Sequence, residues 1–244
     1  MNLLKNILGR VFALWALLVF AVSLLVYFIP IWITGLWPEP KRTIYVFKIF
    51  DIWMTTFFIF SGVKRKITGK DNFKKGQVYV VVCNHNSFMD VPLSSSAIPG
   101  ANKTIAKDEM AKIPVFGTIY KRGSVLVNRK SEESRRASYT KMKEVLKMGL
   151  HMCIYPEGTR NKTSQPLQRF HDGAFKLAVE TGKAVIPAVI FNTTKVLPTN
   201  KTFFFWPQQV EMHFLPAIES TGRSTQELKE QVFEVMKNYY LNHQ

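Results

Sequence analysis

The sequence has very little cysteine. Among its 244 residues there are only two, Cys83 and Cys153. Two cysteines cannot build a disulfide-dense secreted scaffold or a four-ligand zinc site. Both lie in apolar, strand-like stretches, so we expect buried packing residues in a reducing compartment.

Acidic residues are also scarce, at 17 against 33 lysines and arginines, which leaves a net charge of +16. This excess predicts contact with a polyanion: nucleic acid, an anionic membrane or a phosphorylated substrate. The basic residues are dispersed, and no nucleic-acid-binding motif accompanies them. A membrane-tethered nucleic-acid-binding protein is therefore only a distant alternative, and we expect no nucleic-acid partner.

Several catalytic motifs are missing. The chain has no G-x-S-x-G, no G-x-x-x-x-G-K-[ST], no G-x-G-x-x-G and no H-E-x-x-H. These absences argue against a serine hydrolase of the nucleophile-elbow type, a P-loop nucleotide site, a dinucleotide fold and a zinc peptidase. Ser87 is the one tempting nucleophile, and it is better explained as a helix N-cap.

Charge is absent from Val11 to Pro38, a run of 28 residues rich in Leu, Val, Phe and Trp. Crossing a bilayer takes about 20 apolar residues. The apolar part of a secretory signal runs only about 7–15 residues. The run therefore predicts a retained membrane anchor, with a buried core helix or a cleaved signal as alternatives.

A second apolar stretch, Ile44 to Val63, carries Lys48 and Asp51. Lys48 lies near one end and can extend its ammonium to the interface, but Asp51 is costly inside a bilayer. The two stretches predict either a spanning hairpin or two helices half-sunk in one leaflet.

Either arrangement returns the chain to its starting side. Basic residues then gather on that side: Lys5, Arg10, Lys64, Arg65 and Lys66. The positive-inside bias places such residues in the cytoplasm. We therefore expect a membrane-associating helical pair with a basic linker at residues 1–66, and a catalytic domain at residues 67–244 on the cytoplasmic face of the cell's inner membrane.

The second part alternates strand-like and helix-like patterns. The expected strands are Val78–Cys83, Ser124–Val127, Met152–Tyr155 and Val185–Ile190, with one or two edge strands in Phe203–Ile218. The expected helices are Glu132–Met148, Gly173–Thr181 with Asp172 as N-cap and Gly182 as C-cap, and a last helix opened by a capping box at Ser224 and ending near Leu241. This alternation predicts an α/β domain with a central, mostly parallel sheet flanked by helices.

One loop carries a histidine and an aspartate. The first expected strand leads into Asn84-His-Asn-Ser-Phe-Met-Asp90, at the sheet edge where α/β proteins bind ligands. His85 and Asp90 do not share a helix face. A turn opening a helix at this point would fold Asp90 back to the imidazole. Asp90 would then hold one ring nitrogen protonated and leave the other as a base. The alternative is a loop histidine beside a capping aspartate.

Two arginines end neighbouring segments. Gly123-Ser-Val-Leu-Val-Asn-Arg129 and Tyr155-Pro-Glu-Gly-Thr-Arg160 each leave a strand. Guanidinium groups at one edge of a sheet form a fork suited to a phosphate monoester. A single exposed arginine would be an ordinary solvated charge, whereas two beside a His/Asp pair predict an anion site.

With these blocks the chain resembles the glycerolipid acyltransferases, specifically the bacterial 1-acylglycerol-3-phosphate acyltransferases. The resemblance covers about residues 65–215. It rests on NHNSFMD (84–90), KDE (107–109) with Pro114 and Gly117, GSVLVNR (123–129), YPEGTR (155–160) and VIPAVI (185–190). Departures are Tyr155 for the usual Phe, Asn128 where Asp is frequent, and His171-Asp172 where basic residues are common.

The resemblance implies a reaction. His85 would act as base on the sn-2 hydroxyl of lysophosphatidic acid, with Asp90 orienting the imidazole, and an acyl-CoA or acyl carrier protein would supply the acyl group. Phosphatidic acid would form without cofactor or metal. The residues expected at the acceptor phosphate and glycerol are Arg129, Glu157, Gly158, Thr159, Arg160 and Lys107. The alternative acceptors are another lyso-lipid, such as a lyso-ornithine lipid or lysophosphatidylglycerol, or glycerol 3-phosphate. The expected partners are the thioester donor, lysophosphatidic acid and an anionic bilayer.

Overall fold

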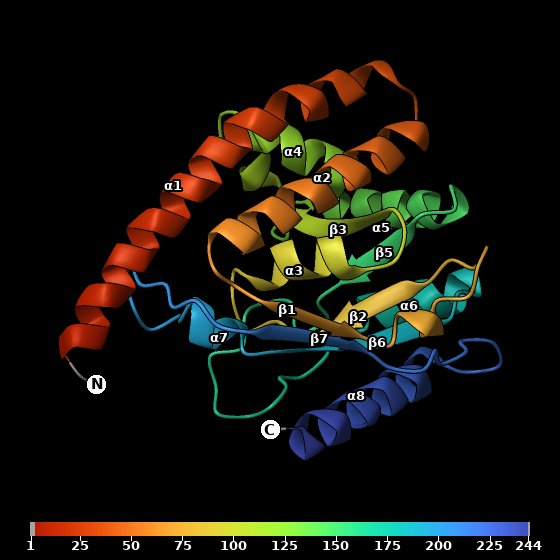
Figure 1. Ribbon diagram of the computed structural model, residues 1–244. Coiled ribbons are helices and arrows are strands. Elements are labelled where there is room, and N and C mark those ends of the chain that lie inside the picture. The colour runs from red at the N-terminus through yellow and green to blue at the C-terminus, as the bar shows by residue number, and fades with distance from the viewer. Residues whose placement is uncertain (1–2, 244) are drawn as a thin grey trace.

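A seven-stranded sheet forms the centre of the molecule (Figure 1). The computed structural model describes residues 3–243. The strands in chain order are β1 (Arg65–Thr68), β2 (Val80–Cys83), β3 (Asn102–Lys107), β4 (Ser124–Val127), β5 (His151–Ile154), β6 (Val185–Phe191) and β7 (Val210–Phe214). Their order across the sheet is β1-β7-β6-β2-β5-β3-β4.

The five strands from β2 to β6 run parallel to one another. β7 pairs antiparallel with β6, and β1 pairs parallel with β7. The carboxyl ends of β2 to β6 therefore meet at one edge. The mostly parallel α/β sheet that the sequence predicts is confirmed.

Helices cover both faces of the sheet. They are α1 (Leu3–Ile33), α2 (Lys41–Phe60), α3 (Asp90–Ala97), α4 (Phe116–Gly123), α5 (Glu132–Lys147), α6 (Gly173–Thr181), α7 (Thr193–Val196) and α8 (Thr225–Asn242), with short 3-10 turns at Thr34–Leu36, Lys70–Asn72 and Asp108–Lys112. Successive residues of β2 point to opposite faces, so Val81 packs among residues of α1 to α4, whereas Val80 and Val82 pack among residues of α5, α6 and α8.

Local signals set most helix ends as expected. Ser224 and Glu227 form the predicted capping box of α8, and Gly182 ends α6 in the left-handed conformation. Asp172 is the N-cap residue of α6, as expected, but its side chain makes no capping hydrogen bond. Its carboxylate accepts a hydrogen bond from Lys229 Nζ at 2.7 Å instead.

The strands β1 and β7 differ from what the sequence predicts. β1 lies inside the stretch that was expected to be a basic linker. The predicted domain boundary between residues 66 and 67 therefore falls within β1, and this boundary stays a prediction. The strand expected at an edge within Phe203–Ile218 is β7, which lies between β1 and β6. Pro207 precedes β7, so the missing proline N–H costs no ladder hydrogen bond.

α1 and α2 are both long and apolar enough to cross a membrane. They form an antiparallel pair, joined by hydrogen bonds from Trp53 Nε1 to Ser23 Oγ (2.9 Å) and between the hydroxyls of Tyr27 and Thr56 (2.9 Å). α2 also packs on α3, and both helices share one hydrophobic cluster with the sheet. The pair is thus docked on the domain along its length (Figure 1).

The segment that joins the two helices is also fixed to the domain. Lys103 of β3 makes a salt bridge of 2.9 Å with Glu39. The Arg122 guanidinium donates to the carbonyl of Ile31 at the end of α1. This bond satisfies one of the carbonyls that a helix end leaves unpaired.

Candidate active site

Loops from four neighbouring strands meet at the carboxyl edge of the sheet. β2 leads into the His85 loop, β4 into Arg129 and β5 into the Tyr155–Arg160 segment. Lys107, the last residue of β3, pairs in register with Val127 of β4, which places it at the same edge. The chain topology therefore gathers the predicted site residues on one side of the domain.

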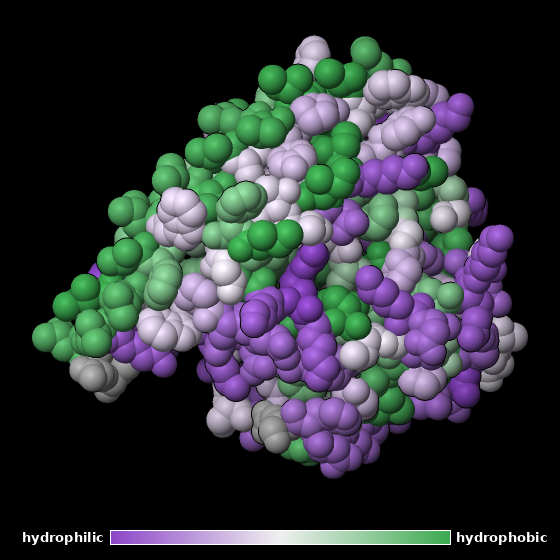
Figure 2. Space-filling view, viewed as in Figure 1, coloured by the Kyte–Doolittle hydropathy of each residue, from purple (hydrophilic) through white to green (hydrophobic). Residues whose placement is uncertain are grey.

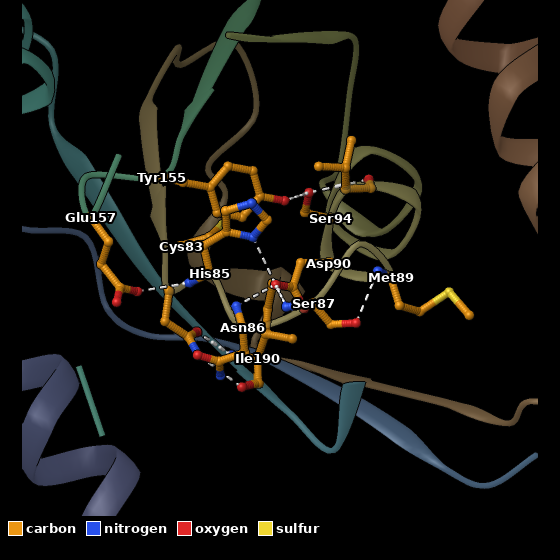
Figure 3. Close-up of polar contacts among 12 residues, drawn as sticks. Cys83, His85, Asn86, Ser87, Met89, Asp90, Ser94, Tyr155, Glu157 and Ile190 are labelled. Atoms are coloured by element: carbon orange, nitrogen blue, oxygen red, sulfur yellow. Dashed lines mark hydrogen bonds and ion pairs between the residues drawn. The ribbon is translucent and has the colours of Figure 1, made fainter. Parts of the chain in front are cut away.

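His85 and Asp90 are in contact (Figure 3). His85 Nδ1 lies 2.8 Å from Asp90 Oδ2. The turn at Asn86 and Ser87 folds the chain so that α3 starts at Asp90, and the backbone N–H groups of both turn residues donate to the same oxygen at 2.6 and 2.7 Å. This is the local fold-back that the sequence predicts, while the catalytic roles of the pair stay a prediction.

The Asp90 carboxylate is completely buried, and the His85 side chain is 18% exposed. Within residues 3–243, Asp90 Oδ1 has no hydrogen-bond partner. Because Asp90 accepts from Nδ1–H, Nε2 is the ring nitrogen that can receive a proton.

Glu157 supports the histidine from the other side. Its Oε1 accepts from the backbone N–H of His85 at 2.8 Å, and its Oε2 accepts from that of Gln168 at 3.0 Å. Burial raises the pKa of the Glu157 carboxyl to about 6, although both N–H donors oppose this shift. In this structure Glu157 fixes the His85 backbone, and its contact with an acceptor stays a prediction.

Tyr155 is a site residue that the sequence did not single out. Its ring centroid lies 4.4 Å from that of His85. Its hydroxyl lies 2.6 Å from Ser94 Oγ, on α3 (Figure 3). Burial raises the pKa of this phenol well above its usual value. Its sequence signals were its place in the YPEGTR block and its position directly after β5 at the sheet edge.

The two predicted arginines both contact the loops around His85. The Arg129 guanidinium donates to the carbonyl of Gly158, and the Arg160 guanidinium stacks 3.6 Å from the ring centroid of Phe88. Gly158 has φ of +70°, which a glycine adopts without strain. Thr159 is exposed between Gly158 and Arg160. Phosphate binding by these residues and by Lys107 stays a prediction.

Ser87 does not cap α3, whose N-cap residue is Met89. Its hydroxyl donates to the carbonyl of Leu197 at 2.9 Å and accepts from the N–H of Met89 at 3.3 Å.

Cys83 and Cys153 are both buried, as expected, with their sulfurs 3.8 Å apart.

The chain is similar to known proteins in sequence and in fold. The Acyltransferase family model matches residues 64–191. The crystal structure of the 1-acyl-sn-glycerophosphate (LPA) acyltransferase PlsC from Thermotoga maritima superposes with a TM-score of 0.84 at 25% identity, covering 98% of each chain.

Curated relatives carry the same description. A 1-acyl-sn-glycerol-3-phosphate acyltransferase of Borreliella burgdorferi is 28% identical over 73% of this chain and 70% of its own length. The chloroplastic enzyme LPAT1 of Arabidopsis thaliana is 31% identical over 66% of this chain, which spans 45% of that protein. The human beta enzyme is 28% identical over 74% of this chain, which spans 65% of it. The family model covers more than half of the sequence, and the chain belongs to the Acyltransferase family.

Proposed function

We propose that this protein transfers a fatty acyl group from an acyl thioester to the sn-2 hydroxyl of lysophosphatidic acid, which yields phosphatidic acid. The observation that carries the proposal is the 2.8 Å contact between His85 Nδ1 and Asp90 Oδ2 beside two arginines. It joins a general base to an anion site at one sheet edge. The named relatives act on the same acceptor according to their descriptions.

In the proposed reaction His85 Nε2 takes the proton of the acceptor hydroxyl. The oxygen attacks the thioester carbonyl carbon, the C–S bond breaks, and the imidazolium returns the proton to the leaving thiolate. Asp90 stabilises the imidazolium and keeps Nδ1 protonated. General-base catalysis of this kind contributes about 10²–10⁴ in rate. The residues described here supply the proton transfers without a cofactor or a metal.

The acceptor phosphate is bound by Arg129 and Arg160, with Lys107 at the same edge. Two guanidinium groups offer paired donors that match phosphate oxygens. Gly158 and Thr159 belong to the same loop as Arg160. Glu157 anchors this loop through its hydrogen bonds to the backbone N–H groups of His85 and Gln168. Binding of the phosphate at a fixed distance from His85 brings the sn-2 hydroxyl to Nε2, and such positioning is a large part of the rate gain.

An apolar cavity of about 90 Å³ lies between the helical pair and the sheet. Its walls include Phe50 and Trp53 of α2, Val91 of α3 and Gly123 at the end of α4. Val91 directly follows Asp90 in the chain, so α3 contributes both to the cavity wall and to the candidate site. We assign it to the hydrocarbon end of an acyl chain, since burial of each CH₂ contributes about 0.8 kcal/mol.

The helical pair supports attachment to a membrane. Hydrophobic side chains cover the outer face of α1 along its length, whereas the neighbouring domain surface is largely hydrophilic (Figure 2). Because α2 packs on α3 and both helices contact the domain, the pair is best accommodated half-sunk in one leaflet rather than spanning. The basic domain then lies on an anionic surface, which for a bacterial cell is the cytoplasmic face of the inner membrane.

The test is acyl transfer by the purified full-length protein. Lysophosphatidic acid is supplied with labelled palmitoyl-CoA or palmitoyl carrier protein, and glycerol 3-phosphate or lysophosphatidylglycerol replaces the acceptor in parallel. Labelled phosphatidic acid is the expected product, and the active donor is identified directly. His85→Ala should abolish product while retaining the thermal unfolding curve, and His243→Ala, an exposed histidine, is the matched control. Near-normal turnover by His85→Ala would exclude His85 as the base.

A further inference from the structure

The segment from Pro156 to His171 connects β5 to α6. The N–H of His171 donates to the carbonyl of Pro156 at 2.8 Å and closes the segment at its base. Leu167, near its far end, is buried in the hydrophobic cluster on the α5, α6 and α8 side of the sheet. The proposed reaction uses residues of the first half of the segment, and it gives no role to Asn161.

Both backbone polar groups of His85 bind to this segment. The N–H of His85 donates to Glu157 Oε1 at 2.8 Å (Figure 3). The carbonyl of His85 accepts from the backbone N–H of Asn161 at 2.6 Å. His85 lies beyond the end of β2 at Cys83, so the segment supplies the partners that a neighbouring strand supplies inside the sheet. The position of the imidazole therefore depends on where the segment places Glu157 and Asn161.

The Asn161 side chain determines the shape of the segment. Its Oδ1 accepts from the N–H of Thr163 at 2.8 Å and from Thr163 Oγ1 at 2.7 Å. The first of these bonds closes an Asx-turn, in which an asparagine side chain bonds the backbone two residues further on. Its Nδ2 donates to the carbonyl of Gln165 at 2.8 Å. Asn161 is buried, so these bonds replace contacts with water that the amide would otherwise make.

Gln168 joins this network to Glu157. Its side-chain amide donates to Asn161 Oδ1 at 3.2 Å, and its backbone N–H donates to Glu157 Oε2 at 3.0 Å. Glu157 and Asn161 are thus held relative to each other through one residue, and each of them holds one backbone group of His85. The Asn161 side chain therefore acts on His85 along two routes.

We propose that Asn161 is a positioning residue, which orients His85 through the shape that its side chain gives to the segment. The proposal deepens the proposed function and rests on it. Asn161 directly follows Arg160, but its hydrogen bonds lead to His85 and into the segment. A displacement of about 1 Å at a reacting group can cost about a hundredfold in rate. Loss of the Asn161 side chain should therefore act on kcat and leave KM unchanged.

The test is steady-state acyl transfer from a palmitoyl thioester to lysophosphatidic acid by the full-length Asn161→Ala protein. Its kcat should fall roughly tenfold to a hundredfold, with KM for both substrates unchanged. Asn161→Ser should recover most of this loss, because a serine hydroxyl accepts from the same N–H, although more weakly. Unchanged kcat in Asn161→Ala would overturn the proposal. A rise in KM for lysophosphatidic acid alone would also overturn it, because it would link Asn161 to Arg160.

The control is Asn72→Ala. The Asn72 side chain donates to the carbonyl of Phe214 at 3.0 Å, just after β1. β1 runs opposite to β2, so this loop lies at the other edge of the sheet. The control should lower the thermal unfolding midpoint and leave kcat unchanged. An equal fall in kcat in Asn72→Ala and Asn161→Ala would overturn the proposal, because it would mean a general loosening of the fold.

Thr163→Ala keeps the test decisive if Asn161→Ala does not fold. It removes an exposed hydroxyl that bonds Asn161 Oδ1 and leaves the buried amide in place. Its kcat should fall a few-fold with KM unchanged, and an unchanged kcat would then overturn the proposal.

A second readout does not depend on acyl transfer. In protein labelled with ¹⁵N-histidine, the Nδ1–H of His85 that donates to Asp90 should give a downfield proton signal, which His85→Ala removes. Asn161→Ala should shift or broaden this signal, and Asn72→Ala should keep it. An unaltered signal in Asn161→Ala would overturn the proposal. If the unmodified protein formed no phosphatidic acid, the proposed function would fail, and this signal would still decide whether Asn161 positions His85.

Discussion

The Tyr155 hydroxyl and the Ser94 hydroxyl lie 2.6 Å apart, and this bond holds the Tyr155 ring against the His85 imidazole. Ser94 is on α3, the helix that Asp90 begins. One buried hydrogen bond therefore links the segment after β5 to the helix that carries the partner of the base. Tyr155 acts as a positioning residue in this arrangement.

The two single variants that remove this hydrogen bond should lose different amounts of folding free energy. Tyr155→Phe removes one hydroxyl and should cost about 1 kcal/mol, whereas Ser94→Ala strands a buried phenol and should cost about 1–3 kcal/mol. The double variant should resemble Tyr155→Phe alone. Urea unfolding of the four proteins measures the coupling, and kcat should fall a few-fold in both single variants with KM unchanged. Additive losses of stability would argue against the bond.

Glu157→Gln should lower kcat by at least tenfold. The amide places an NH₂ group against a backbone N–H of His85 or Gln168, and an unmatched buried donor costs about 1–3 kcal/mol. Steady-state kinetics measures the loss, with exposed Glu234→Gln as control. Burial raises the pKa of the Glu157 carboxyl from its usual 4.5 to about 6. The folded protein should therefore lose stability as the pH rises from 4.5 through 6, because the buried carboxyl becomes ionised. The unfolding free energy of Glu157→Gln should lack this dependence.

Arg160→Ala should raise KM for lysophosphatidic acid by roughly tenfold to a hundredfold, as expected for loss of a charge-assisted hydrogen bond. KM for the thioester donor should change little. Arg136→Ala is the control, because Arg136 is an exposed residue of α5 that forms an ion pair with Glu132 on the same helix. A larger effect on the donor than on the acceptor would move Arg160 out of the acceptor site.

Gly123→Val should shift acyl preference toward shorter chains. Gly123 lines the apolar cavity, and a Cβ added there meets nothing within 4 Å, so we expect the valine side chain to take up part of the cavity. Each displaced methylene forfeits about 0.8 kcal/mol, or roughly fourfold in kcat/KM. Competition between donors of graded length measures the shift. Gly173→Val, which also has open space but lies outside the cavity, should leave the preference unchanged.

His151 should make the protein sensitive to acid. Its Nδ1 accepts from the N–H of Tyr79 at 3.1 Å, and burial lowers its pKa to about 4. Since the folded pKa lies below the unfolded 6.5, the stability is present above pH 6.5 and is lost as pH falls through 4, by about 3 kcal/mol. His151→Asn keeps an acceptor without titrating. Unfolding curves should show a smaller loss between these pH values for the variant, and equal losses would contradict the assignment.

Sequence patterns predicted the elements whose signals are local. β4 and α6 have the expected bounds, β2, β5, β6 and α5 differ by one or two residues, and the Ser224 capping box is present. The contact between His85 and Asp90 was also accessible, since a turn of the intervening residues forms it. The apolar helices were accessible for the same reason, since length and composition alone identify them.

The structural features that the sequence patterns did not predict have a common cause. β1 has only four residues, and its pairing partner β7 lies more than 140 positions away, so no local pattern marked it as a strand. The hydrogen bond from Lys229 to Asp172 spans 57 positions, and it likewise has no local signal.

The order of residues alone determined the helical pair, the alternation of strands and helices, and the loops that carry His85, Arg129 and Arg160, because periodicity, capping and turns depend on near neighbours. Long-range packing placed Glu157 on the His85 backbone, Tyr155 against its ring and the outer helices on the domain. Those contacts join residues dozens of positions apart, and their free energy comes from burial and pairing that exist only in the assembled core.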